Sequence, residues 1–418
     1  MTAKASVASA QSDVGLGNGR SALARRIASK TGIYAGFVAT GISVALPGAL
    51  LPLLLSRWHL GDVRGGLLLF CFFIATTTGA LLSRGVMNRS VARGSVLAAV
   101  GAAWLGLANR GWAFAAIALF GLGLGIAMTS TSLLVSRRWP EERRTEMMRL
   151  NLLWAAGACA GPWLGLGGRA LRSAASTSRP LHVLAGLAVF FVAWAVWMWI
   201  AESDIAPSSE ELQGGDSRAS AKSGHRWLLL TLPLPVLVIL FSATGVESST
   251  GGWLTAYTQR LGETAPTTIG AATAFWVGLL TSRFVHSIRQ TEHLRERGVL
   301  AGSALLMSAG LVVLIAGPAG FTSVVAAFAV GFGVGPMYPL ALTIALRRCE
   351  SLGAFVLAGF GSATLPLFTG TVSSWSHSLA AGLGVPLAAA AVMVIAGLRS
   401  PEDPRAVAFA APDPSAAQ

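Results

Sequence analysis

Long apolar runs recur along this chain, and each is long enough to cross a lipid bilayer as a helix. A spanning helix needs about 20 mainly apolar residues, and the hydrocarbon layer offers no water to an exposed backbone. The runs lack the alternating pattern of barrel strands. The sequence therefore predicts an all-α membrane protein with twelve transmembrane helices. The expected spans are 33–55, 65–84, 92–109, 111–136, 147–171, 180–201, 227–257, 265–288, 298–317, 319–346, 351–375 and 378–398.

Composition agrees with this class. Of the 418 residues, 53% are hydrophobic and only 12% are charged, whereas a soluble domain has about 25% charged residues. The three cysteines, Cys71, Cys159 and Cys349, lie far apart within apolar runs, so they suggest neither a disulfide framework nor a metal site. The six histidines lie singly near segment ends or in loops. Because no catalytic cluster, metal-ligand spacing or phosphate loop is present, the sequence predicts a protein that is not an enzyme and needs no cofactor or metal.

A polar segment divides the predicted spans into two equal groups. Residues 202–225 have the composition of a solvated linker, with six spans before them and six after. The organisation expected is a tail at 1–32, a first half at 33–201, the linker at 202–225, a second half at 226–398 and a tail at 399–418.

Lysine and arginine predict the orientation. If both tails and the linker lie on one side, roughly three quarters of the 31 lysines and arginines lie there too. The positive-inside rule then places both termini and the linker in the cytoplasm, which makes the plasma (cytoplasmic) membrane the expected location. The net charge of +13 is thus explained by membrane topology, and no nucleic-acid partner is expected.

The two halves carry an internal repeat. The hexapeptide Gly79–Arg84, at the end of the second span, recurs as Gly278–Arg283 at the end of the eighth. Two parallel six-helix halves of this kind are typical of secondary transporters. Two further matches support the repeat: Gly121, Gly123 and Gly125 with Gly331, Gly333 and Gly335, and Gly157 and Pro162 with Gly361 and Pro366.

Glu247 is the one acidic residue near the middle of a predicted span. A carboxylate at this depth is costly and is tolerated mainly where it faces a cavity or a partner. No lysine or arginine is identified within the spans to pair with it. Because low dielectric disfavours the charged form, Glu247 is the candidate to bind and release a coupling proton. The alternative is a glutamate that only hydrogen-bonds a neighbouring helix.

Several stretches together resemble a known family. They are GISVALPGALLPLL in the first span, LNLLWAAGACAGP in the fifth, FWVGLLTSR in the eighth and GFGVGPMYPLALTIAL at 331–346. With the two-half pattern, they resemble the major facilitator superfamily over residues 33–398, and more specifically its fucose-permease-type sugar and proton symporter branch. The resemblance implies the major facilitator fold and alternating access. It makes Arg84 and Arg283, which close the repeated hexapeptides, candidates for an inner gate.

The sequence also departs from that family. In the superfamily, the loop signature after the second helix carries an acidic residue where Ser83 stands, and Ser282 occupies the matching place in the second half. The branch is associated with buried carboxylates in its first and fourth helices, and neither span contains one here. Glu247 is therefore the remaining candidate for proton coupling.

The resemblance implies a substrate cavity at the bilayer midplane between the halves. A small neutral polar solute such as a sugar is the expected substrate. The alternatives are efflux of hydrophobic or drug-like compounds and a non-transporting sensor on the same fold. The expected partners are this small molecule, the lipid bilayer and protons, and a monomer is expected. The candidate substrate-binding residues are Ser43, Thr129, Thr131, Ser132, Asn151, Trp154, Ser248, Trp253, Tyr257, Trp276 and Tyr338.

Overall fold

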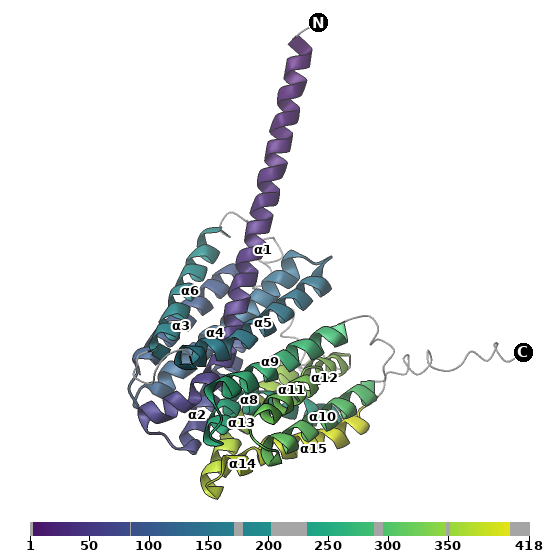
Figure 1. Cartoon of the computed structure of the whole chain (residues 1–418). Helices are drawn as coiled ribbons and strands as arrows, with labels where there is room; N and C mark the ends of the chain where they lie inside the picture. The colour runs from purple at the N-terminus through teal and green to yellow at the C-terminus, as the bar shows by residue number, and fades with distance from the viewer. Residues whose placement is uncertain are drawn as a thin grey trace, which may run out of the picture.

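The computed structural model describes residues 3–83, 85–170, 179–201, 232–287, 296–347 and 352–401. Every regular element in these ranges is a helix. The first half contains α1 (Ala3–Trp58), α2 (Asp62–Leu82), α3 (Met87–Leu107), α4 (Ala113–Arg138), α5 (Arg143–Ala170) and α6 (Arg179–Ala201). The second half contains α8 (Leu234–Arg260), α9 (Ala265–Ser287), α10 (Glu296–Ala316), α11 (Phe321–Val334), α12 (Met337–Leu346), α13 (Leu352–Ser376), α14 (Leu379–Gly382) and α15 (Gly384–Leu398). Figure 1 shows the two halves as adjacent bundles.

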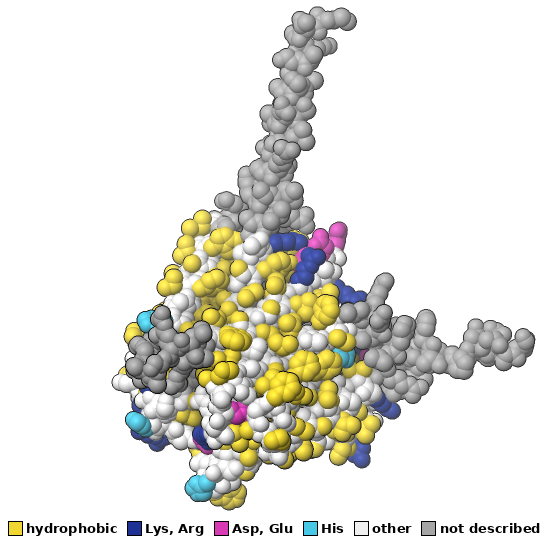
Figure 2. All heavy atoms as spheres, in the orientation of Figure 1, with side chains coloured by type: hydrophobic (Ala, Val, Ile, Leu, Met, Phe, Trp, Pro, Cys, Tyr) yellow, Lys and Arg dark blue, Asp and Glu magenta, His cyan; other side chains and the backbone are white. Residues whose placement is uncertain are grey.

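The all-α prediction is confirmed. Within the described ranges, eleven helical stretches are long and apolar enough to cross a membrane. Helix α5 is not among them, but with 28 residues it is long enough to complete a set of twelve. On the face shown in Figure 2, hydrophobic side chains are spread over the whole described surface, and most of the charged side chains lie toward its edges. The expected linker at 202–225 and most of the tail at 399–418 fall outside the described residues.

Some element boundaries differ from the expected ones. Helix α1 begins at Ala3 and extends beyond the bundle (Figure 1), so one helix continues from the expected tail at 1–32 into the first expected span. No proline interrupts this helix before Pro47, and proline is the strongest helix breaker. The expected span 319–346 consists of α11 and α12, with Pro336 between them. Proline lacks the N–H that would continue the backbone ladder.

Helix α8 also begins later than expected, at Leu234 rather than near residue 227. Pro233 occupies the position before its first turn, and a second proline, Pro235, lies within that turn. Proline is favoured there because the first N–H groups of a helix have no partner inside it. The helix continues to Arg260, which places Glu247 thirteen residues from either end.

The sequence repeat is also a packing repeat. A Cβ atom added at Gly157 on α5 would lie 2.1 Å from the carbonyl oxygen of Val38 on α1. In the second half, a Cβ at Gly361 on α13 would lie 1.9 Å from the carbonyl oxygen of Phe241 on α8. Each glycine therefore allows the same pair of helices to approach closely in its own half.

A second repeated contact uses the hexapeptide glycines. A Cβ at Gly79 on α2 would lie 2.2 Å from the carbonyl oxygen of Leu122 on α4. A Cβ at Gly278 on α9 would lie 2.3 Å from the carbonyl oxygen of Phe328 on α11. The repeat in sequence thus preserves backbone contacts that no larger residue permits.

A buried carboxylate fastens α1 to α5. The Glu146 side chain has no exposed surface and lies 2.8 Å from the Lys30 ammonium and 3.0 Å from the Arg149 guanidinium. The Tyr34 hydroxyl donates to the same carboxylate. Two cations and a hydroxyl thus compensate the burial of this charge. All four groups belong to the first half.

At the opposite end of the molecule, a polar cluster joins the two halves. Arg260 of α8 donates to both carboxylate oxygens of Asp62 on α2, at 2.8 and 2.5 Å. The Ser373 hydroxyl of α13 donates to Asp62 at 2.6 Å. Bidentate arginine–carboxylate pairs combine hydrogen bonding with ion pairing and fix geometry. We call Asp62, Arg260 and Ser373 the clasp; it holds this end of the two halves together.

We expect Gly361→Ala and Gly157→Ala to lower stability by about 1–3 kcal/mol each, because a methyl group must push the facing backbone away. Gly186→Ala on α6 is the matched control, since nothing lies within 4 Å of a Cβ there. Thermal unfolding of the purified protein measures the effect. Unchanged melting temperatures for the first two variants would contradict the packing repeat.

The clasp is expected to give a measurable coupling energy between its charges. In a double-mutant cycle of Asp62→Asn and Arg260→Gln, we expect about 0.5–1 kcal/mol of coupling, because the Arg260 side chain is 45% exposed and water weakens such pairs. The coupling should shrink at 1 M salt, where the screening length falls to about 3 Å. Thermal unfolding of the four proteins measures it. Additive effects at low salt would show that the clasp does not act as a unit.

Candidate substrate cavity

A cavity of about 1860 Å³ lies between the two halves. Helices α1, α2, α4 and α5 of the first half line it, together with α8, α9, α10, α12 and α13 of the second. It reaches the surface beside Glu141 between α4 and α5, beside Arg143 and Arg144 at the start of α5, and beside Arg347 at the end of α12. We call this end the mouth; the clasp lies at the other end.

Close helix contacts form the floor of the cavity. A Cβ atom at Gly48 on α1 would lie 2.1 Å from the carbonyl oxygen of Gly251 on α8. Both glycines line the cavity, as does Gly252. The next helical turn of α8 carries Trp253, which is fully buried. The two halves therefore touch one turn beyond Glu247, and the cavity ends there.

An ion pair lies deep in the cavity wall. The Arg283 guanidinium of α9 lies 3.5 Å from the Glu247 carboxylate of α8, and both side chains are less than a fifth exposed. The expectation that Glu247 has no cationic partner is therefore wrong. Helix α9 continues to Ser287, so Arg283 lies a turn inside the helix. A long arginine side chain can then place its charge well away from its own backbone.

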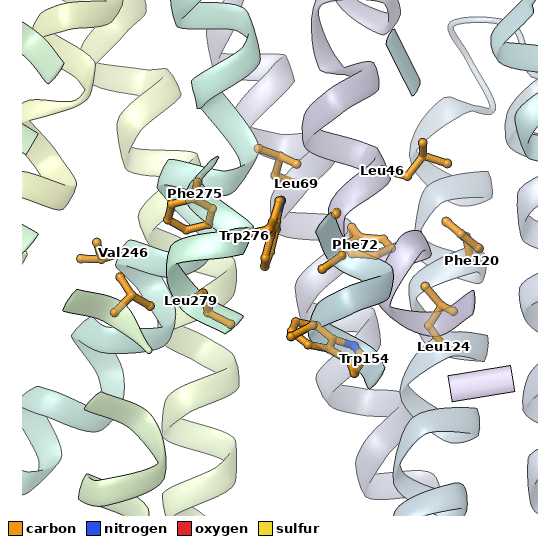
Figure 3. Packing of buried hydrophobic residues seen from close by; sticks show 14 of the residues in the cluster. Leu46, Leu69, Phe72, Phe120, Leu124, Trp154, Val246, Phe275, Trp276 and Leu279 are labelled. Carbon is orange, nitrogen blue, oxygen red and sulfur yellow. The ribbon is translucent and has the colours of Figure 1, made fainter. Parts of the chain in front are cut away.

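Two tryptophans from different halves meet beside this pair. The rings of Trp154 on α5 and Trp276 on α9 pack edge to face, with centroids 6.0 Å apart. Figure 3 shows these rings approaching one another from ribbons of the two halves. The Arg283 guanidinium lies 5.4 Å from the centre of the Trp154 ring, within the range of a cation–π contact. Arg283 thus contacts a carboxylate in its own half and an aromatic ring in the other.

Most of the candidate substrate-binding residues line this cavity. Asn151 is exposed within it, and its amide nitrogen donates to the Met147 carbonyl at 3.0 Å. The Ser248 hydroxyl donates to the Ser362 carbonyl at 2.8 Å. The seven candidates in the lining are Thr129, Ser132, Asn151, Trp154, Ser248, Trp276 and Tyr338.

Two hydroxyl candidates lie outside the lining. Ser43 is fully buried and donates to the Ala39 carbonyl at 2.8 Å. Thr131 is 1% exposed and donates to the Ala127 carbonyl at 2.7 Å. Each hydroxyl faces its own helix backbone within the packed first half. Placing them in the cavity was wrong, because sequence does not give the rotation of a helix.

Two aromatic candidates are also outside it. The Trp253 indole N–H donates to the Pro366 carbonyl at 2.9 Å, so the ring packs at the closed end against α13. The Tyr257 hydroxyl donates to the carbonyls of Leu314 and Ile315 on α10, at 3.1 and 3.3 Å. Both were expected to line the cavity, and that prediction is wrong for the same reason, since sequence does not give the rotation of a helix. Both rings fill helix interfaces.

The gate residues differ in outcome. Arg84 lies outside the described residues, so its gating role remains a prediction. Arg283 lines the cavity and pairs with Glu247 rather than closing a helix end.

Ser83, which replaces an acidic residue of the family signature, lies 2.5 Å from the Ser130 hydroxyl, and Ser130 donates to Ser90 at 2.7 Å. Uncharged hydroxyls therefore join α2, α4 and α3 at this point.

One lining residue outside the candidate set could have been found from its spacing in the sequence. Ser136 lines the cavity and follows Ser132 by four residues, so the two lie on one helical face.

Within the described residues, no three His, Cys, Asp or Glu side chains are grouped closely enough to hold a metal ion.

Comparison with known proteins defines the class. The Major Facilitator Superfamily model matches residues 33–355, more than three quarters of the chain. The chain therefore belongs to the Major Facilitator Superfamily. The predicted fold, all-α with twelve helices in two halves, is confirmed. A member of this superfamily is a secondary transporter embedded in a membrane, not an enzyme, and its partner is a small-molecule substrate.

Solved structures show the same fold. A variant of the E. coli fucose:proton symporter FucP is 18% identical with a TM-score of 0.57, over 90% of this chain and 99% of that one. FucP in the outward conformation gives 17% and 0.55, over 88% and 98%. A bacterial homolog of the human lysosomal transporter Spinster, inward-facing and occupied, gives 12% and 0.65, over 89% and 95%. No curated protein matches this sequence. At these identities the three structures show a shared fold.

Removing one charge of the Glu247–Arg283 pair should lower the stability of the protein more than removing both. We expect Arg283→Gln to lower stability by about 1–3 kcal/mol, because it leaves a carboxylate uncompensated in the cavity wall. Adding Glu247→Gln should recover most of that loss. Arg347→Gln is the control: its pair with Glu296 lies at the mouth, where the arginine side chain is 47% exposed, so the loss should stay below about 1 kcal/mol. Thermal unfolding in detergent measures all three variants, and a double variant less stable than Arg283→Gln would contradict the pairing.

Proposed function

We propose that this protein is a proton-coupled symporter for a small neutral polar solute such as a sugar. Glu247 carries the proton, and the halves at 33–201 and 226–398 rock about the cavity between them. The observation that carries this proposal is the Glu247–Arg283 pair beside two tryptophan rings in a cavity shared by both halves.

The side chains that line the cavity favour a sugar as the substrate. Trp154 and Trp276 offer flat apolar surfaces, which suit the C–H faces of a sugar ring. Hydroxyl, amide and charged groups around them can bond its hydroxyl groups and fix its orientation. The similarity to the fucose:proton symporter FucP supports the same class of substrate and coupling.

The ion pair gives proton coupling a physical basis. With Arg283 at 3.5 Å, a deprotonated Glu247 leaves the pair without net charge. A proton on Glu247 leaves the Arg283 charge uncompensated in a low-dielectric wall, with the Trp154 ring as its other neighbour. Proton binding therefore changes the electrostatic interactions of Arg283, which connects α9 of the second half to α5 of the first. A ligand that favours one of these states shifts the conformational equilibrium accordingly.

The observed shape supports an inward-open state. The positive-inside rule puts the mouth, the termini and the linker in the cytoplasm, at the plasma membrane. The TM-score is higher to the inward-facing Spinster homolog, 0.65, than to FucP in the outward conformation, 0.55. In this reading the clasp and the cavity floor form the closed outer gate.

Efflux of hydrophobic or drug-like compounds is the alternative function. Its support is the lining itself, in which Met128, Met147 and Met148 stand among aromatic side chains. Methionine is flexible and polarisable and adapts to ligands of varied shape. The cavity of about 1860 Å³ also exceeds the usual range of small-molecule pockets, about 300–1,000 Å³.

The decisive variant is Glu247→Gln, which keeps the shape of the side chain but cannot release a proton. In proteoliposomes we expect wild-type protein to accumulate a labelled sugar from a panel of mono- and disaccharides when a pH gradient is imposed. The variant should lose gradient-driven accumulation while retaining binding and counterflow. Glu142→Gln is the matched control, because that carboxylate is half exposed beside Lys30.

Two results would contradict the proposal. Wild-type-like dependence on the pH gradient in Glu247→Gln would exclude Glu247 as the proton carrier. Transport of lipophilic amines in place of every sugar tested would favour the efflux alternative.

A further inference from the structure

We propose that three hydroxyl groups on one face of α4 determine the specificity of the cavity for hydroxyl-rich solutes. They belong to Thr129, Ser132 and Ser136, which we call the hydroxyl row. This inference rests on the proposed function and names the residues by which the first half would recognise the substrate.

The row is a geometrical feature of α4. The three residues are spaced by three and four positions, so they project from one side of the helix. All three line the cavity. At 1.5 Å per residue the row extends about 10 Å along the helix, from the middle of the bundle toward the mouth. One solute with several hydroxyl groups can therefore contact more than one member.

These hydroxyls are free, whereas their neighbours are engaged. None of the three has a hydrogen-bond partner within the part of the chain that the structure describes. Thr131, on another face of the same helix, donates to the carbonyl four residues earlier. Such back-bonding is the usual arrangement of serine and threonine inside helices.

The facing wall shows the opposite pattern. The hydroxyls of Thr244, Ser248, Thr343 and Ser362 line the cavity from the second half, and each donates to a backbone carbonyl. The second half instead offers charge, through Glu247 and Arg283. Among the serine and threonine side chains of the lining, unused hydroxyls are thus concentrated on the first half, and the deep charges lie on the second. Tyr338 is the second half's exception, because its hydroxyl lines the cavity without a hydrogen-bond partner among the described residues.

Physical chemistry then indicates what the row binds. In the open cavity water can bond these hydroxyls, but closure around a substrate removes that water. A hydroxyl left without a partner in an apolar environment costs free energy. Because each hydroxyl is both donor and acceptor, it matches a substrate hydroxyl in either direction. A site built in this way discriminates strongly against a solute that lacks those groups. The row therefore favours a polyhydroxyl compound over a lipophilic one.

The experiment compares Thr129→Val, Ser132→Ala, Ser136→Ala and the triple variant with wild-type protein. The probes are D-glucose, L-fucose, maltose and the lipophilic cation tetraphenylphosphonium, and binding is measured from ligand-induced shifts in melting temperature. For the sugar that wild-type protein binds best, we expect each variant to weaken binding by about 3- to 10-fold, the worth of one neutral hydrogen bond. Binding of the lipophilic cation should stay unchanged.

Thr131→Val is the matched control. It removes a hydroxyl from the same helix, but one that is already bonded to Ala127, so sugar affinity should not change. Melting without ligand confirms that each variant is folded. If wild-type protein binds a sugar and the triple variant binds it equally well, the row plays no part in specificity. If wild-type protein binds only the lipophilic cation, the proposed function itself fails and this inference falls with it.

Discussion

A charge pair in the wall of a membrane-embedded cavity is the interaction on which the rest of this structure depends. Glu247 lies midway along α8, where an isolated carboxylate is costly. Two features compensate for that cost. Arg283 lies 3.5 Å away, and the cavity admits water to a site that is otherwise surrounded by apolar side chains. The helices must therefore stay apart on the mouth side of Glu247.

The same helices must touch on the other side of Glu247, and glycine makes this possible. Gly48 and Gly251 bring α1 and α8 into backbone contact just beyond the charge pair. Further out, Asp62 and Arg260 join the halves at the surface. Closure at one end and separation at the other give the single-sided access that an alternating transporter needs at each stage of its cycle.

The two walls of the cavity differ in chemistry although the two halves are repeats. The second half supplies the deep charges, Glu247 and Arg283, and the first half supplies unused hydroxyls along α4. Arg283 reaches across to the ring of Trp154, so the charged half and the neutral half are in contact at the site itself. A change in the charge state of Glu247 therefore alters the electrostatic environment of Arg283, which contacts both halves.

The sequence by itself determined the class of fold, because apolar length and the spacing of glycines act locally along each helix. It also singled out Glu247, since a charge in an apolar run is visible without neighbours. Only the tertiary structure decided which side of each helix faces the cavity. It paired Arg283 with Glu247, and it turned Trp253 and Tyr257 into helix interfaces and Ser43 onto its own backbone. Helix rotation depends on packing between segments that are far apart in the chain, and a single sequence records that packing only indirectly.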